Sequence, residues 1–162
     1  MKIVNEFSNY HTSYAFETGI TRNGVFLSDD RQCTAICYRY NFKKDGFKDY
    51  WNQLLLVLNC IGISNLSSVL KREAYINKLR PKDGQFLYFW FFGATQRGIK
   101  MRSVYELKKH IFDLSKNLNL PIYLETSVPK NQKIYQRFGF EIYHTWGQRE
   151  QTTLWFMKRE PR

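Results

Sequence analysis

Three polar side chains around the apolar run at residues 120–124 have types and spacings that suit acid–base chemistry. Glu125 comes directly after the run, and Asn131 and Tyr135 follow, four residues apart. A spacing of four places two side chains on one face of a helix, one turn apart. A carboxylate can remove a proton from an amine, and a phenol, with a pKa of about 10, can donate one. The stretch therefore holds a candidate base and a candidate acid.

Each candidate also has a simpler structural interpretation. Glu125 could bond a neighbouring backbone group or Thr126, and Tyr135 could be an aromatic packing residue. His144 is a second candidate base because histidine titrates near neutral pH, although lone histidines near strand ends are more often surface or core residues. The base therefore stays open between Glu125 and His144.

A strand–helix–strand unit positions these residues. The aromatic run QFLYFWFFGA, residues 85–94, predicts a central strand covered on both faces. Apolar residues that recur every three to four positions predict a helix over 104–114 that ends near Asn117 or Asn119. Residues 120–127 form the next strand, so the two strands should be parallel neighbours with the helix as their crossover.

Further strands and helices extend this unit on both sides. A hairpin is predicted from GVFLSDD and QCTAICYRYNF, with its turn at residues 29–31. Helices are predicted within 8–20, over 43–63, from about 64 to 79 and around Asn131 and Tyr135, and strands over 140–146 and 152–160. The expected fold class is a mixed α/β sheet with helices on both faces.

The loop TQRGIKMRS, between the central strand and the following helix, is a candidate anion site. A helix N-terminus attracts anions, and Arg97, Lys100 and Arg102 lie there around Gly98. Ordinary exposed basic residues would give the same composition. The position before a helix favours phosphate binding.

Composition limits the classes of protein that remain. A chain of 162 residues, 43% hydrophobic and 17% aromatic, is expected to form one domain over 1–162 rather than a disordered segment. The formal net charge of +11 favours anionic partners, but the basic residues are dispersed, which makes nucleic acid an unlikely partner.

Targeting and metal-binding signals are missing from the sequence. The N-terminus has no secretory pattern, and no apolar run approaches the roughly 20 residues needed to cross a bilayer, so we expect a soluble, cytoplasmic protein without a membrane partner. Cys33, Cys37 and Cys60 lack zinc-ligand spacing and are expected to be free thiols. No metal is expected.

Four segments resemble the GNAT superfamily of N-acetyltransferases, in particular bacterial members with a YLETS strand and a YxxFGF turn. They are FLYFWFFGA, LPIYLETSVPKN, IYQRFGFEIYHTW and TLWFMKREP. The resemblance covers roughly residues 24 to 158. It implies the GNAT fold, with splayed parallel strands at the cofactor site, and transfer of the acetyl group of acetyl-CoA to an amine by direct attack.

The resemblance also implies roles for individual residues. Asn131 would bond the pantetheine region, and Tyr135 would protonate the leaving thiolate. Glu125 would be the catalytic base or contact the substrate, and His144 and Trp146 would line the acceptor pocket. Backbone amides at a strand bulge and the phosphate loop would bind the rest of the cofactor, through Phe92, Gly93, Ala94, Arg97, Gly98, Lys100, Met101, Arg102, Ser103 and Val104.

The phosphate loop departs from the family pattern Q/RxxGxG/A. Aligned on Arg97, the chain has Lys100 and Arg102 where the family has glycines; aligned on Gln96, it has Ile99 and Met101. Cationic side chains could replace close amide contacts to phosphate. Alternatively, the chain is a catalytically degenerate GNAT-like module that binds CoA or a partner.

The N-terminal region of about residues 1–23 is shorter than in the family. Part of the acceptor pocket would then be rebuilt, or completed by a second subunit in a homodimer. The acceptor is expected to be a small-molecule or peptide amine.

Overall fold

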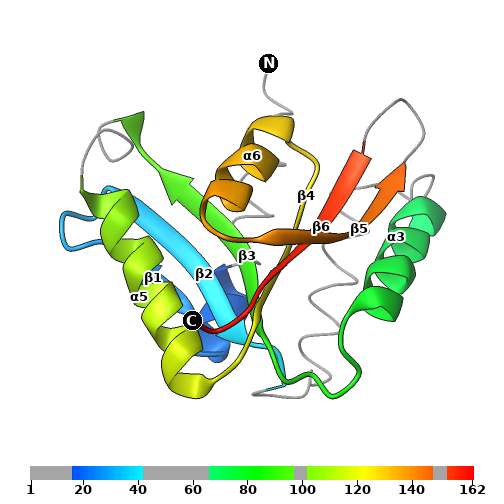
Figure 1. Ribbon diagram of the computed structural model, residues 1–162, viewed down its shortest axis with the longest axis horizontal. Coiled ribbons are helices and arrows are strands. Elements are labelled where there is room, and N and C mark those ends of the chain that lie inside the picture. The colour runs from blue at the N-terminus through cyan, green and yellow to red at the C-terminus, as the bar shows by residue number, and fades with distance from the viewer. Residues whose placement is uncertain (1–15, 42–65, 97–101, 148–152) are drawn as a thin grey trace.

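The computed structural model describes residues 16–41, 66–96, 102–147 and 153–162. These residues form one six-stranded sheet in the order β1-β2-β3-β4-β6-β5 (Figure 1). The strands are β1 (Val25–Leu27), β2 (Cys33–Arg39), β3 (Leu87–Ala94), β4 (Ile122–Thr126), β5 (Glu141–Gly147) and β6 (Thr153–Arg159). The labelled helices are α3 (Leu66–Leu79), α5 (Ser103–Leu118) and α6 (Pro129–Arg137). Residues 16–21 are also helical, so the helix expected within 8–20 is present in its described part.

The strand–helix–strand unit has the predicted connection. β3 and β4 are parallel and α5 crosses between them, whereas the other neighbouring strands are antiparallel. α5 ends at Leu118, and Asn119 follows in the left-handed conformation with φ of 53°, a common way to end a helix. β1 and β2 form the predicted hairpin. The helix expected over 43–63 lies outside the described residues.

Helices cover both faces of the sheet, which confirms the predicted fold class. α5 packs Leu107 and Ile111 against the strand residues Leu87, Ile122 and Leu124. These side chains are 3% exposed or less, and burying each one contributes about 2 kcal/mol.

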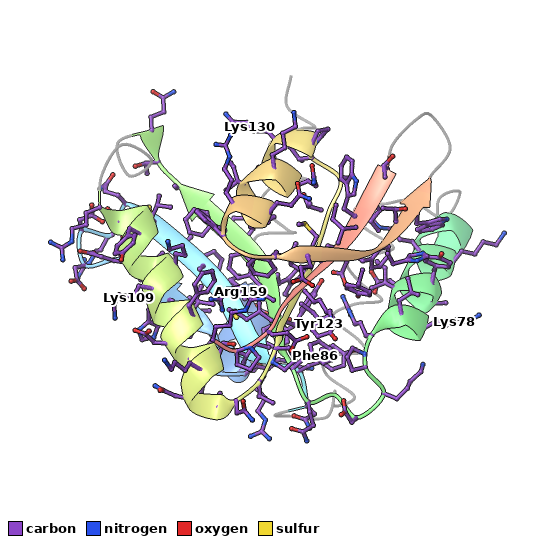
Figure 2. The ribbon with its side chains drawn as sticks, viewed as in Figure 1. Lys78, Phe86, Lys109, Tyr123, Lys130 and Arg159 are labelled. Carbon is purple, nitrogen blue, oxygen red and sulfur yellow. The ribbon has the colours of Figure 1, made fainter. Side chains whose placement is uncertain are left out.

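α3 covers the opposite face. Its Ile76 packs with Leu154 and Phe156 of β6, which alternate with the residues that face α5. An aromatic cluster continues this face across the middle strands, where Phe86 and Tyr123 lie 5.0 Å apart between ring centroids (Figure 2). We call the two sides of the sheet the α5 face and the α3 face.

β3 and β4 diverge soon after they meet. They pair only at Leu87 with Ile122 and Tyr88 with Tyr123, although β3 has eight residues and β4 has five. From Phe89 onward, β3 is paired with β2 alone among the described residues. The splayed parallel strands expected at the cofactor site are therefore present.

A bulge in β3 lies just beyond the divergence. Phe89 pairs with Cys37 and Phe91 with Ile36, so Trp90 is the extra residue on β3. The extra residue shifts the alternation of side chains, which brings Phe89 and Phe92 to the same face, although they are three positions apart.

The prediction that β3 is covered on both faces is correct only for its first residues. Leu87 is 1% exposed and Tyr88 9%, whereas Phe91 is 37% exposed. The later residues of β3 are more exposed because β4 no longer pairs with β3 after Tyr88.

Candidate active site

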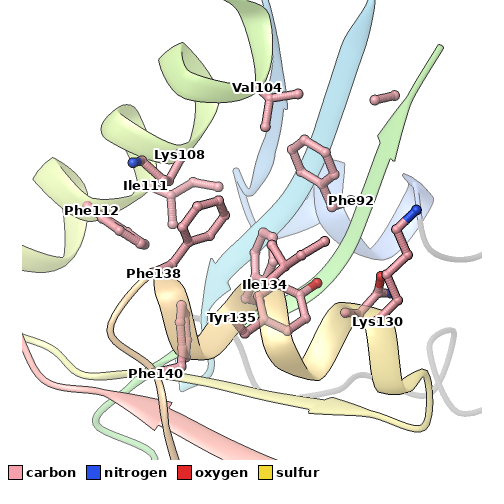
Figure 3. Close-up of a pocket in the computed structure, with 13 residues that line it drawn as sticks. Phe92, Val104, Lys108, Ile111, Phe112, Lys130, Ile134, Tyr135, Phe138 and Phe140 are labelled. Carbon is pink, nitrogen blue, oxygen red and sulfur yellow. The ribbon is translucent and has the colours of Figure 1, made fainter. Parts of the chain in front are cut away.

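α6 presents Asn131 and Tyr135 one turn apart, as their spacing predicts. The helix begins at Pro129, whose fixed backbone angle suits a first helical position, after the extended residue Val128. Asn131 and Tyr135 both line a pocket of about 510 Å³ between α5, α6 and β3 (Figure 3).

The pocket is mainly apolar. Phe89, Phe92 and Ala94 of β3 form one wall, and Val104 and Ile111 of α5 form another. Polar groups come from a small set of lining residues, which are Lys108, Lys130, Asn131 and Tyr135. An apolar cavity with a few convergent polar groups is typical of a site for an organic ligand.

Tyr135 combines packing with an available hydroxyl. Its ring meets Phe89 edge-on at 6.1 Å and Phe140 at 5.7 Å between centroids. In Figure 3 the hydroxyl points away from Phe140, toward the side of the pocket where Lys130 lies. Burial raises the pKa of Tyr135 above its ordinary value, so the phenol stays protonated at neutral pH and can donate a proton.

The candidate backbone contacts on β3 lie beside this pocket. Phe92 and Ala94 line it, and Gly93 between them pairs with Thr34 of β2. Among the described residues, none of these three has a partner on β4, because the strands have already diverged.

The predicted phosphate loop is only partly described. Arg97, Gly98, Lys100 and Met101 lie outside the described residues. Arg102 is 84% exposed and forms an ion pair of 3.2 Å with Glu106.

The first two residues of α5, Ser103 and Val104, face different surroundings. Val104 faces the pocket, whereas the buried Ser103 donates a hydrogen bond of 2.6 Å from Oγ to Oδ2 of Asp30. Sequence reasoning missed Asp30, which is 73 positions away and carries no motif. A carboxylate thus lies at the positive end of the helix.

Glu125 lies on the α3 face, opposite the pocket. It alternates with Leu124, which packs in the core on the α5 face. The guanidinium of Arg80 donates from Nε to Oε1 and from Nη2 to Oε2, each at 3.2 Å, and Tyr88 donates to Oε2 at 2.8 Å. Both carboxylate oxygens are therefore engaged, and Arg80 and Tyr88 are further residues that sequence reasoning missed.

His144 and Trp146 also lie on the α3 face, beside α3. Nε2 of His144 shares a hydrogen bond of 2.7 Å with the hydroxyl of Tyr75, and the ring of Trp146 stacks on Tyr75 at 4.5 Å. A bulge in β5 at Tyr143 shifts His144 onto this face. Among the described residues, the cofactor candidates that line the pocket therefore lie on one side of the sheet and the acceptor candidates on the other.

No protein-family model matches the chain. It is similar to an uncharacterized N-acetyltransferase of Schizosaccharomyces pombe, with 28% identity over 127 residues. The aligned part is 76% of this chain and 46% of that protein, so the chain spans about half the length of this relative.

Two solved structures share the arrangement of elements over most of the chain. Arylalkylamine N-acetyltransferase 2 from Aedes aegypti has a TM-score of 0.56 at 12% identity, over 84% of this chain and 71% of that one. The chain has the GNAT fold. The C-terminal condensation domain of Ebony, solved in complex with β-alanyl-dopamine, also has a TM-score of 0.56 at 12% identity, over 90% of this chain and 76% of that one.

The predictions about cysteines, metal ligands and membrane spans can be compared with the described residues. Cys33 and Cys37 are buried free thiols, and Cys60 lies outside the described residues. In the described part of the chain, no three metal-ligating side chains gather in one place. No described helix is both long enough and apolar enough to span a bilayer.

Proposed function

We propose that this chain is an N-acetyltransferase that moves the acetyl group of acetyl-CoA to an amine by direct attack. The observation that carries the proposal is the apolar pocket beside the divergence of β3 and β4, with Asn131 and Tyr135 on one of its walls. The GNAT fold and the relative named an N-acetyltransferase support it.

The pocket residues fit an acyl-CoA. A pantetheine arm is a narrow, largely apolar chain with two amides, which suits aromatic walls and a free strand edge. Acetyl-CoA, when bound, supplies an activated thioester. Phe92, Gly93 and Ala94 offer backbone groups toward that ligand, and Asn131 offers a side-chain amide.

Tyr135 acts as the general acid in this proposal. Its buried phenol is protonated at neutral pH, because burial raises its pKa, and its hydroxyl is directed away from the packed ring of Phe140. Tyr135 donates its proton to the leaving sulfur, which prevents the thiolate from reversing the reaction.

The phosphate end is bound by cations instead of glycine amides. Arg102 is exposed beside the start of α5, and Lys108 and Lys130 lie at the pocket. Together with Arg97 and Lys100 of the loop, they compensate the phosphate charge.

The acceptor amine approaches from the α3 face, where Glu125, His144 and Trp146 lie. His144 is the base in this proposal, in the tautomer in which Nε2–H donates to the hydroxyl of Tyr75 and Nδ1 carries the lone pair. Both oxygens of Glu125 already accept hydrogen bonds. The acceptor class is a small-molecule or peptide amine.

A binding module without catalysis is the alternative function. The carboxylate of Asp30 at the start of α5 favours it, because a negative charge there opposes phosphate, and the loop lacks the family glycines.

Calorimetric titration with acetyl-CoA, followed by an assay for free thiol with a panel of amines, separates the two functions. The enzyme proposal requires binding at one site and thiol release that depends on the amine. Binding without thiol release supports a module that binds CoA. Absence of binding overturns the enzyme proposal and favours a module that binds a partner instead.

A further inference from the structure

Arg80 joins the end of α3 to the middle of the sheet. It follows the last residue of α3. Its guanidinium donates two parallel hydrogen bonds of 3.2 Å to the carboxylate of Glu125. The two side chains are only 9% and 6% exposed. A two-pronged arginine–carboxylate pair fixes orientation as well as charge.

Tyr88 of β3 contacts both members of this ion pair. Its hydroxyl donates a hydrogen bond of 2.8 Å to Oε2 of Glu125, and the guanidinium of Arg80 lies over its ring at 4.2 Å from the centroid. Burial raises the pKa of Tyr88 well above its ordinary value, so the hydroxyl remains a donor. We call Arg80, Tyr88 and Glu125 the splay cluster.

The splay cluster lies where the backbone pairing of β3 and β4 stops. Tyr88 is the last residue of β3 that pairs with β4, and its partner there is Tyr123. Glu125 is two residues further along β4, beyond the paired part. The Tyr88–Glu125 hydrogen bond therefore links the two strands just past the point where their backbones separate.

The splay cluster is connected to the pocket on the other face through β3. Phe89 follows Tyr88 in the chain, points to the α5 face and packs edge-on against Tyr135 at 6.1 Å. A change in the direction of β3 at Tyr88 must move Phe89, and with it the contact that orients Tyr135.

We propose that Arg80, Tyr88 and Glu125 are positioning residues that fix the angle at which β3 and β4 diverge, and with it the shape of the pocket. Glu125 then serves as the anchor of this cluster and is not the catalytic base. The link to acetyl transfer rests on the proposed function, whereas the effect on the strands does not.

Tyr88→Phe is the most selective variant for testing this proposal. It removes one hydroxyl, and it keeps the ring under Arg80 and the ion pair of Arg80 with Glu125. Tyr123→Phe is the matched control, because Tyr123 is the paired neighbour on β4 and its hydroxyl lies outside the splay cluster. Variants at Arg80 leave the buried carboxylate of Glu125 unpaired, and Glu125→Gln leaves the guanidinium of Arg80 without its counter-charge, so a melting temperature is measured first for either kind of variant.

Amide hydrogen exchange of residues 86–92 and 122–126, measured without ligand, tests the strand geometry directly. We expect Tyr88→Phe to speed exchange in both segments at least 5-fold, while Tyr123→Phe stays within about 2-fold of the wild type. Equal exchange in the two variants would overturn the proposal. This readout stands even if the chain binds no acetyl-CoA.

Titration of acetyl-CoA tests the consequence for the pocket. We expect Tyr88→Phe to weaken binding about 10-fold, with the melting temperature within a few degrees of the control variant. If the wild type binds and Tyr88→Phe binds equally well, the connection from the splay cluster to the pocket is wrong. If the wild type does not bind acetyl-CoA, the proposed function fails. The exchange result alone then tests whether the splay cluster fixes the angle between β3 and β4.

The pH profile of turnover separates a positioning role for Glu125 from a role as base. Glu125→Gln should lower turnover, but kcat/KM should still fall at low pH as in the wild type, because another group takes the proton from the amine. We call this fall at low pH the acidic limb. Loss of that limb in Glu125→Gln, with the limb intact in Tyr88→Phe, would show that Glu125 is the base and contradict the proposal.

Discussion

Ser103, the first residue of α5, donates a hydrogen bond of 2.6 Å to the carboxylate of Asp30 in the turn between β1 and β2. The other oxygen of Asp30 accepts from Ser28 Oγ at 2.6 Å and from the backbone of Gln32 at 3.0 Å. The side chain of Gln32 in turn accepts a bond of 2.7 Å from Thr95, which follows β3. The hairpin turn therefore bonds to the chain before and after residues 97–101, at Thr95 and Ser103, and it places a negative charge at the start of α5.

The charge of Asp30 should oppose phosphate binding. Asp30→Asn removes the charge and keeps one of the two carboxylate oxygens as an acceptor, while its NH2 group replaces the other. We expect the affinity for acetyl-CoA to rise about 3-fold, and more at low salt, where charges are less screened. Asp29→Asn, in the same exposed turn, is the control. Calorimetry at two salt concentrations measures the effect, and a weaker affinity in Asp30→Asn would contradict it.

The stability of the protein should depend on the ionisation of Asp30 at acid pH. Hydrogen bonds from Ser103, then Ser28 and Gln32, lower the pKa of Asp30 below its ordinary value of 3.8. A lowered pKa stabilises the fold above the ordinary value, and this contribution is lost as the pH falls through the folded value. The melting temperature should therefore fall less in Asp30→Asn than in the wild type between about pH 5 and about pH 3. Parallel curves for the two proteins would exclude this role.

The helices around the pocket could be predicted from the sequence, because the spacing of apolar and polar residues along a helix depends only on residues close in the chain. Periodicity located the crossover helix and its end near Asn119, and the four-residue spacing placed Asn131 and Tyr135 on one face of α6.

Contacts between distant residues could not be predicted in this way. Arg80 meets Glu125 across 45 positions of the chain, and no spacing rule connects an arginine after a helix to a carboxylate on a strand. The bulge at Trp90 is likewise set by the pairing of β3 with β2, and it decides which aromatic side chains of β3 face the pocket.

A larger side chain at Val104 should fill the pocket. Val104→Trp places an indole where we propose the ligand lies, so we expect acetyl-CoA affinity to fall more than 10-fold. Tyr105→Trp is the matched control, because Tyr105 is the next residue of α5 and is 56% exposed. Titration of both variants, with circular dichroism to check the helix content, measures the effect. Equal affinities would place the ligand elsewhere.

Tyr143 has a buried hydroxyl that makes no hydrogen bond in the described part of the chain. Burial, with the charge of Glu125 nearby, raises its pKa, so it is a neutral phenol without a partner. Removal of an unsatisfied buried hydroxyl should stabilise the fold by about 1 kcal/mol. We therefore expect Tyr143→Phe to raise the melting temperature by about 3 °C. Thermal denaturation measures it, and a decrease would indicate a hydrogen bond from Tyr143 in solution.

Tyr135→Phe tests the general acid. The variant keeps the ring that packs against Phe89 and Phe140, so the affinity for acetyl-CoA should stay within about 2-fold, while turnover falls about 100-fold because the leaving sulfur loses its proton donor. Tyr105→Phe, at an exposed position of α5, should change neither quantity. Because burial raises the pKa of Tyr135 above its ordinary value of 10.0, wild-type turnover should not decline through Tyr135 below pH 10. Unchanged turnover in Tyr135→Phe would reject the acid role of this residue, and it would leave acetyl transfer to be explained by a proton from water.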